Sequence, residues 1–268
     1  MIVHLMGTGA AEGIPAFHSD SRVSRYARKH RGRDIRTRAG AILDGHIKID
    51  LPPDTLAQLQ RDGLDARDWS ALVFTHGHDD HFAYRELQYC LWPFNDMEYA
   101  DFTIYGNEFI AEELAACYPD WPFEVVTTHS FSPFQHADYT VTPVHANHLD
   151  DEDCQNLLFE KAGKSFLYAT DTGIWEEESW TFLARCKLDL LVLECTKGFV
   201  QDAYAGHLAV ESFKAVVKRL REQGTLTDSS RIVTTHHSHN GDATHAELEK
   251  AFKDDGVVVG YDGMKITV

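Results

Sequence analysis

The sequence predicts an α/β (α+β layered) fold in a single domain that spans residues 1–268. Short apolar runs, rich in β-branched and aromatic residues and bordered by Gly, Pro, Asp and Asn, recur along the chain and are typical of strands. Between them lie segments with the apolar spacing of amphipathic helices, and this mixture favours packed layers of both elements. No low-complexity linker and no repeat of fixed period divides the chain, which favours one domain.

The order of these runs gives the expected elements. The expected strands are Ile2–Met6, Ala39–Leu43, His46–Asp50, Ala71–Thr75, Phe102–Tyr105, Glu124–Thr128, Tyr139–His145, Asn156–Lys161, Ser165–Thr170, Leu188–Glu194, Ile232–Thr235, Val257–Tyr261 and Lys265–Val268. The expected helices are Pro53–Arg61, Phe82–Leu91, Glu108–Cys117, Glu176–Arg185, His207–Arg221 and Thr244–Phe252. In the helix expected over 207–221, one buried face is formed by Leu208, Val210, Phe213, Val216, Val217 and Leu220.

Composition narrows the class of protein. The net charge of −17 disfavours general binding to nucleic-acid backbones, which requires clustered Lys and Arg. No apolar stretch is long enough to cross a bilayer, so we expect no membrane partner. The N-terminal residues lack the features of a secretory signal, and the five cysteines are scattered without a Cys-x-x-Cys pair. These features predict a cytoplasmic protein.

One segment departs from the acidic composition. Between residues 22 and 38, only Asp34 opposes the basic residues Arg22, Arg25, Arg28, Lys29, Arg31, Arg33, Arg36 and Arg38. One interpretation is a flexible, solvated loop. The other is a basic flap that closes over an anionic substrate, with Arg22, Arg25, Arg36 and Arg38 as the candidate substrate-binding residues.

The strongest chemical signal follows the expected strand 71–75. Three imidazoles and a carboxylate lie within six residues in the pattern His76-x-His78-x-Asp80-His81, in a chain that holds 16 histidines. Imidazole is the commonest metal ligand near neutral pH, and burial of these groups without a metal would leave costly unpaired polar atoms. The pattern therefore predicts a metal site, and its nitrogen and oxygen ligands suit Zn²⁺ or Mn²⁺.

This motif resembles the signature of the metallo-β-lactamase superfamily, which has a four-layer αββα sandwich. The resemblance implies a site with two divalent metal ions. It assigns His76 and His78 to the first metal, and Asp80 and His81 to the second. The dipeptide Ile49-Asp50 is similar to the first motif of the superfamily, where the aspartate supports the metal-binding loop without binding metal itself.

The resemblance also points to ligands further along the chain. His148 follows the expected strand 139–145 and is assigned to the first metal, with His145 as its rival. Asp171, at the end of the strand 165–170, is assigned to both metals. His236 follows the strand 232–235 and is assigned to the second metal. Nearby, His237 and His239 are candidates for substrate contact or for support of the ligands, and we assign His239 to support.

Three features favour a phosphodiester as substrate. The shared ligand Asp171 lies in a Thr-Asp-Thr context without a cysteine. Glu194, followed by Gly206-His207, is similar to the Glu/His pair of tRNase Z-like phosphodiesterases. That likeness implies that His207 assists the reacting phosphate and that Glu194 orients it, while Asp80 and Asp171 hold a metal-bound hydroxide that attacks phosphorus.

The third feature is that both ends of the chain resemble the phosphoribosyl cyclic phosphate phosphodiesterase family of carbon–phosphorus lyase pathways. The matching segments are 7–15, 235–239 and 260–266. We interpret the recurrent glycines of 7–15 as allowing the backbone to approach a ligand closely. The cysteine-rich loop of that family is absent, so a third, structural metal is not expected. A long arm for tRNA is also absent, and we therefore expect a small, possibly cyclic phosphodiester.

Other functions stay open on sequence alone. A lactone or ester hydrolase could use the same metals, and a tRNA 3′-processing endonuclease or a non-catalytic metal-binding sensor would share the ligands. A homodimer is possible, because Tyr89, Trp92 and Phe94 suit either an interface or a core.

Overall fold

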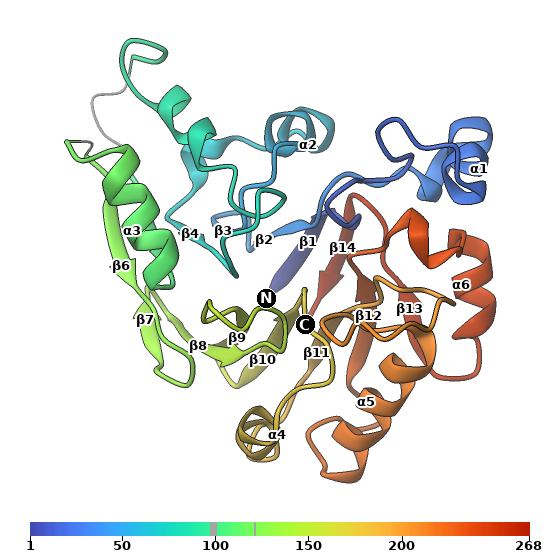
Figure 1. The fold of residues 1–268 in the computed structure, drawn as a ribbon. Helices are drawn as coiled ribbons and strands as arrows, with labels where there is room; N and C mark the ends of the chain where they lie inside the picture. Colours follow the sequence, from blue (N-terminus) through green and yellow to red (C-terminus); the bar gives the residue numbers. More distant parts are fainter. Residues whose placement is uncertain (97–100, 121) are drawn as a thin grey trace.

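The computed structural model describes residues 1–96, 101–120 and 122–268, which form two seven-stranded sheets (Figure 1). The strands of the first sheet are, in spatial order, β14 (Met264–Thr267), β1 (Ile2–Gly7), β2 (Gly40–Leu43), β3 (Ile47–Ile49), β4 (Ala71–Val73), β5 (Thr103–Gly106) and β6 (Glu124–Thr127). Those of the second are β13 (Val257–Val259), β12 (Arg231–Thr235), β11 (Leu190–Glu194), β10 (Lys164–Ala169), β9 (Gln155–Lys161), β8 (Tyr139–His145) and β7 (Phe134–His136).

Five of the α-helices cover the outer faces of the two sheets, and the first one packs beside the short helical turn 239–241 (Figure 1). The α-helices are α1 (Arg22–His30), α2 (Thr55–Asp62), α3 (Glu108–Cys117), α4 (Glu177–Leu183), α5 (Val210–Glu222) and α6 (His245–Ala251). Short 3-10 helices cover Gly32–Asp34, Ala66–Asp68, Tyr84–Cys90 and His239–Gly241. With α2 and α3 on the first sheet and α4, α5 and α6 on the second, the four-layer αββα prediction is confirmed.

A shared apolar core holds the two sheets together. Alternate residues of the strands point inward, because side chains of a strand project to opposite faces. The first sheet contributes Val3, Leu5 and Val73, and the second contributes Phe166 and Val192, all of them buried. The core supports our proposal that residues 1–268 form one domain.

The direction of the strands decides where the polar residues gather. β3 and β4 run parallel in the first sheet, and β10, β11 and β12 run parallel in the second. β8 is antiparallel to β9, which is antiparallel to β10, so β8 has the direction of β10. The residues that follow the carboxyl ends of these strands include Asp50, His76, His148, Asp171 and His236. They meet at one edge of the sandwich, as the next subsection describes.

The basic segment is not a flexible loop over residues 22–30, where the structure has helix α1. Ser21 caps the helix by accepting a hydrogen bond from the Ser24 amide at 3.1 Å. Val23 and Ala27, one turn apart, bury their side chains against Ile14 and Ile35. Two small apolar positions among many charges give a weak helical pattern, which explains why the sequence did not predict this helix.

Two other differences are local. The strand β7 was not expected, because it is a three-residue edge strand that pairs only with β8. The segment expected as a helix over 82–91 contains a 3-10 helix, Tyr84–Cys90, in place of an α-helix. The aromatic residues Tyr89, Trp92 and Phe94 in and after it are 50%, 76% and 60% exposed, so they are not core residues. No helix within the described part of the chain is long and apolar enough to cross a membrane.

The buried carboxylate of Asp262 joins the two ends of the chain. One of its oxygens accepts hydrogen bonds from the Thr8 amide and hydroxyl at 2.9 and 2.8 Å, and the other accepts from the Thr37 amide and hydroxyl at 2.8 and 2.6 Å. Arg61 lies 3.2 Å from the second oxygen. The segments 7–15 and 260–266, which the sequence singled out together, are therefore in contact.

We expect Asp262→Ala to lower the free energy of unfolding by about 3 kcal/mol, because the part-buried amide of Thr37 and the hydroxyls of Thr8 and Thr37 would lose their acceptor. Urea denaturation would measure the change. The exposed neighbour Asp254 provides the matched control, and Asp254→Ala should shift stability by less than about 0.5 kcal/mol. Equal stability of the two variants would contradict the role given to Asp262.

Candidate metal centre

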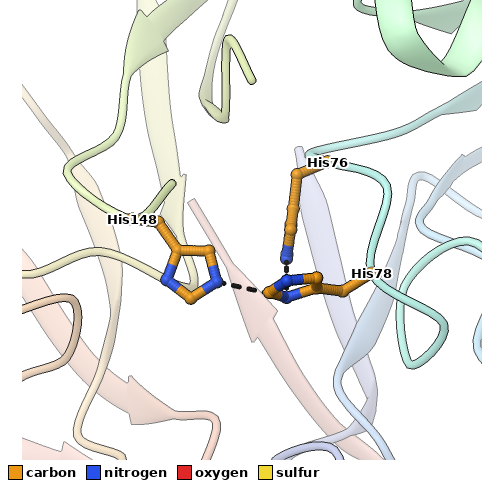
Figure 2. Close-up of side chains that lie close together, drawn as sticks. All are labelled: His76, His78 and His148. Carbon is orange, nitrogen blue, oxygen red and sulfur yellow. Dashed lines mark hydrogen bonds between the residues drawn. The ribbon is translucent and has the colours of Figure 1, made fainter. Parts of the chain in front are cut away.

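Three histidines from two loops form the first cluster (Figure 2). His76 and His78 lie in the turn after β4, and His148 follows β8. The Nδ1 atom of His78 lies 3.1 Å from Nε2 of His76 and 3.2 Å from Nε2 of His148. His145, the rival of His148, is not in this cluster, since its Nδ1 lies 3.2 Å from a carboxylate oxygen of Asp153.

Asp80, His81 and His236 form the second cluster. The Nε2 atoms of the two histidines are 3.4 Å apart. The Oδ2 atom of Asp80 lies 3.2 Å from Nε2 of His81 and 3.5 Å from Nε2 of His236. All three side chains are buried.

Asp171 lies between the two clusters and faces both. Its Oδ1 is 3.7 Å from Nε2 of His148, in the first cluster. Its Oδ2 is 3.0 Å from Nε2 of His81 and 3.2 Å from Nε2 of His236, in the second. The structure thus brings together all seven residues that the sequence assigned to metal.

The opposite ring nitrogens of these histidines are held by the protein. Nδ1 of His81 lies 2.7 Å from Asp50, and Nδ1 of His236 lies 2.9 Å from the Thr196 hydroxyl. Nδ1 of His76 lies 3.1 Å from the Thr75 hydroxyl. Such contacts fix a ring so that its other nitrogen points at a metal. Asp50 therefore occupies the supporting position expected of it.

The donor set fits divalent metal ions. Two nitrogens bound to one tetrahedral zinc at about 2.0–2.1 Å would be roughly 3.3 Å apart, close to the separations in the first cluster. Burial holds the pKa of His76 well below its usual value, which favours the neutral, ligating form. Burial would raise the pKa of Asp171, but His236 and His81 outweigh it and hold that pKa well below the usual value. Burial would lower the pKa of His81, but Asp80 and Asp171 outweigh it and raise that pKa well above its usual value, so a cation that binds here must displace a proton.

The pair of His207 and Glu194 lies beside the clusters. Nδ1 of His207 is 2.6 Å from Oε1 of Glu194, a fully buried carboxylate at the end of β11. A ligand atom of His207 also lies within 4.8 Å of those of His148 and Asp171. Burial would lower the pKa of His207, but Glu194 outweighs it and raises the pKa to about 9. The protonated form of the His207 imidazole is therefore favoured at neutral pH in the metal-free protein.

A cavity of about 360 Å³, which we call the catalytic cavity, opens over these residues. His78, Asp80, His148, Asp171, His207 and His236 all line it. Glu12, Lys197 and Tyr204 add to its walls. The volume is in the range of small-molecule sites.

The four arginines proposed to bind substrate do not line this cavity. Arg36 is buried and donates to the Thr8 hydroxyl and the Gly260 carbonyl at 2.6 and 2.7 Å. The other three form ion pairs, Arg22 with Asp242 and Glu247, Arg25 with Asp20, and Arg38 with Asp54. The geometry therefore gives no support to a basic flap, and the charge of these residues is used within the protein.

The structure gives His239 and the glycines of 7–15 other contacts than the sequence predicted. Nδ1 of His239 lies 3.0 Å from the Ser21 hydroxyl and its Nε2 lies 3.6 Å from Glu12, so it contacts the rim of the cavity and not a metal-assigned residue. Gly7 does not approach a ligand, because a Cβ atom there would overlap the Arg38 carbonyl. The glycines of 7–15 serve backbone packing, and only Ala10, Ala11 and Glu12 of that segment reach the cavity.

Sequence reasoning missed Glu152. Its Oε1 accepts hydrogen bonds from the amide of Gly77, between His76 and His78, at 2.7 Å and from the side chain of Asn107 at 2.6 Å. Asn107 also caps α3, so Glu152 ties the His-x-His turn to that helix. The only signal was an acidic run over 150–153, which by itself suggests a solvated surface.

Comparison with known proteins agrees with this geometry. A family model described as the beta-lactamase superfamily domain matches residues 46–237. A diphosphatase from the PhnP family has a similar structure (TM-score 0.78, 22% identity, 100% of this chain and 97% of that chain covered). Zn²⁺-bound PqqB from Methylobacterium extorquens is also similar (TM-score 0.75, 17% identity, 100% of this chain and 100% of that chain covered). The short form of human tRNase Z is similar as well (TM-score 0.65, 19% identity, 100% of this chain and 99% of that chain covered). At these identities the likeness shows a shared fold, and no curated protein sequence matches the chain.

Glu152→Ala should weaken metal binding at His76, His78 and His148 by about tenfold or more, because the turn would lose the acceptor that holds it. Competition with a chromophoric chelator would measure the affinity. Glu152→Gln keeps an acceptor oxygen and should stay near wild type, as should Asp151→Ala at the exposed neighbouring position. Unchanged affinity in Glu152→Ala would show that the contact does not position the ligands.

Proposed function

The chain belongs to the beta-lactamase superfamily, and from this we propose that it is a hydrolase of small phosphodiesters that uses two divalent ions, zinc or manganese. The fold implies divalent metal binding, and the two clusters provide the ligands. His76, His78 and His148 would hold one ion, and Asp80, His81 and His236 the other. Asp171, with one oxygen toward each cluster, would bind both.

The observation that carries this proposal is the contact between His207 and Glu194 at 2.6 Å in the wall of the catalytic cavity. A histidine in this position can donate a proton to a leaving oxygen. Glu194 is held rigidly, since it accepts hydrogen bonds from the amides of Thr172, Thr196 and Leu208 at 3.0, 3.0 and 3.1 Å. The carboxylate thus orients the imidazole and favours its protonated form.

The residues around the cavity would have separate roles in hydrolysis. When bound, the two ions would activate water and stabilise negative charge on the phosphoryl oxygens. Asp171 lies between the two clusters and lines the cavity together with Asp80, so the two carboxylates would orient the attacking water there. The water would release one proton to solvent as its oxygen forms a bond to phosphorus and the bond from phosphorus to the leaving oxygen breaks. His207 supplies the proton that converts the leaving oxygen into an alcohol.

Charge supports a small substrate over a nucleic acid. The chain carries a net charge of −17, and five arginines of the basic segment are engaged in contacts within the protein, namely Arg22, Arg25, Arg33, Arg36 and Arg38. Two proteins of similar structure are named a diphosphatase and a tRNase, which is consistent with chemistry at phosphate. A nucleic-acid substrate would require cationic residues around the cavity.

Hydrolysis of bis(4-nitrophenyl) phosphate, set against a panel of lactones, tests the proposal. We expect metal-dependent turnover of the phosphodiester after reconstitution with Zn²⁺ or Mn²⁺. Faster turnover of lactones would favour the ester-hydrolase alternative. Metal binding without turnover of either class would point to a sensor.

His207→Ala should lower kcat by about 10²- to 10⁴-fold while both metals remain bound, because it removes the proton donor and no assigned ligand. Stopped assays and elemental analysis would measure the two quantities. His129→Ala, at an exposed position, is the matched control and should change neither. Loss of metal in His207→Ala would instead make His207 a ligand.

The pH profile should depend on Glu194. Because the pKa of His207 is raised, its imidazolium is present below about pH 9 and is lost above it, so kcat should fall as pH rises through that region. Bound cations would lower this pKa, and the fall should then begin below pH 9. Glu194→Gln removes the carboxylate that stabilises the imidazolium, so it should move the fall in kcat to lower pH. A profile that does not move would exclude His207 as the acid, provided that circular dichroism shows a folded variant.

A further inference from the structure

We propose that a second cavity, beside the catalytic one, is a subsite for the leaving alcohol and takes a compact, uncharged, aryl-like group; this rests on the proposed function. The cavity, which we call the side cavity, has a volume of about 310 Å³. It is lined by residues of the segment 197–212 together with Asn147 and Ile174. The volume lies at the lower end of the range for small-molecule sites.

The two cavities share a wall. His207, Lys197, Asp202 and Tyr204 line both of them. Nδ1 of His207 is hydrogen-bonded to Glu194, so Nε2 is the ring nitrogen that would protonate a leaving oxygen. The group attached to that oxygen would therefore lie close to His207, which also borders the side cavity. The side cavity is the space that receives it on the far side of the wall.

The lining of the side cavity favours an apolar or aromatic group. Ile174 and Tyr204 are 50% and 52% exposed, although both are large and border a cavity. The ring of Tyr204 lies 5.5 Å from that of His207, so a flat group beside His207 would meet its face or edge. Leu208 and Ala209 extend the apolar lining.

Charge disfavours an anionic leaving group. Asp202 and Glu211 line the cavity, and the two cationic side chains in its wall, Lys197 and His207, already pair with Asp202 and Glu194. The Lys197 ammonium lies 2.6 Å from Asp202 and donates to the Tyr204 carbonyl at 2.8 Å. A second phosphate or a nucleotide chain would thus enter beside carboxylates without a free cation to balance it. An uncharged alcohol meets no such penalty.

Two glycines, Gly173 and Gly206, lie in the wall between the two cavities, close to Asp171 and His207. A Cβ atom on Gly173, two residues after Asp171, would overlap the Ala205 carbonyl. A Cβ atom on Gly206, just before His207, would lie 2.6 Å from the Tyr204 hydroxyl. Both glycines allow the loop that carries Tyr204 to pack closely beside the site. The contact at Gly173, which is with backbone, therefore packs Ala205 of this loop against the turn after β10.

Two substrates that release the same group test the proposal by steady-state kinetics. Methyl 4-nitrophenyl phosphate and phenyl 4-nitrophenyl phosphate both release 4-nitrophenolate and differ only in the group retained on phosphorus. Ile174→Asn and Tyr204→Ala should raise KM by the same factor for both substrates, roughly three- to tenfold, with a smaller change in kcat. Ile2→Asn is the matched control, since Ile2 is 49% exposed and lies far along the chain on β1.

A change in KM for the phenyl substrate alone would overturn the proposal, because the cavity would then hold the retained group. Unchanged KM for both substrates would also overturn it.

Binding of phenol, measured by calorimetry on the metal-loaded protein, gives a test without turnover. Phenol should bind to wild type and to Ile2→Asn, and more weakly to Ile174→Asn and Tyr204→Ala. Equal binding to all four proteins, or none to wild type, would contradict an aryl subsite. If wild type binds phenol in this pattern but hydrolyses neither phosphodiester, the subsite stands and the proposed function fails.

Discussion

The hydrogen bonds on the outer side of the imidazole rings are the constraint on which the site depends. Because Asp50 holds His81 and Thr196 holds His236, their inner nitrogens face each other and Asp171 across 3.0–3.4 Å. Neutral imidazoles in this arrangement cannot all satisfy one another, since each has one donor and one acceptor. The chain accepts further strain to keep it, with φ values of 57° at Asp50, 46° at Asp171 and 54° at His236.

The residues assigned to metal could be predicted because the resemblance names positions that directly follow apolar strands. A parallel strand order brings carboxyl ends to one edge, so an imidazole or carboxylate directly after an apolar run is already placed in space before any contact is known. The resemblance favoured His148 over His145, whose position in the alternating strand suited a strand residue, and the structure puts His148 in the cluster and pairs His145 with Asp153. Thirteen of the strands were expected from their apolar runs, whereas β7 was too short and too near the edge to show a pattern.

Features that depend on partners distant in sequence were not predictable. The charge density of residues 22–38 does not reveal that Arg22 meets Asp242 and Glu247 across the fold, and α1 has only two small apolar residues to indicate it. Glu152 acts through a contact with Gly77 that is 75 residues away. The glycines of 7–15 look like a ligand-binding loop in sequence, but the space that they leave is filled by the backbone around Arg38. The local sequence pattern shows which type of residue stands at such a position, but it does not show which distant residue it contacts.

The contacts of Asp262 have a consequence for the order in which the protein folds. Thr8 and Thr37 are made early during synthesis, yet their shared acceptor belongs to the segment that leads into β14. A ribosome-bound chain can pair β1 with β2 and join the segment 7–15 to Arg36 and Thr37 through backbone hydrogen bonds. The hydroxyls of Thr8 and Thr37, however, lack their shared acceptor until residue 262 has emerged. Contacts of such long sequence separation form slowly. Because the same segment brings Glu12 to the rim of the catalytic cavity, that rim should be among the last parts of the molecule to order.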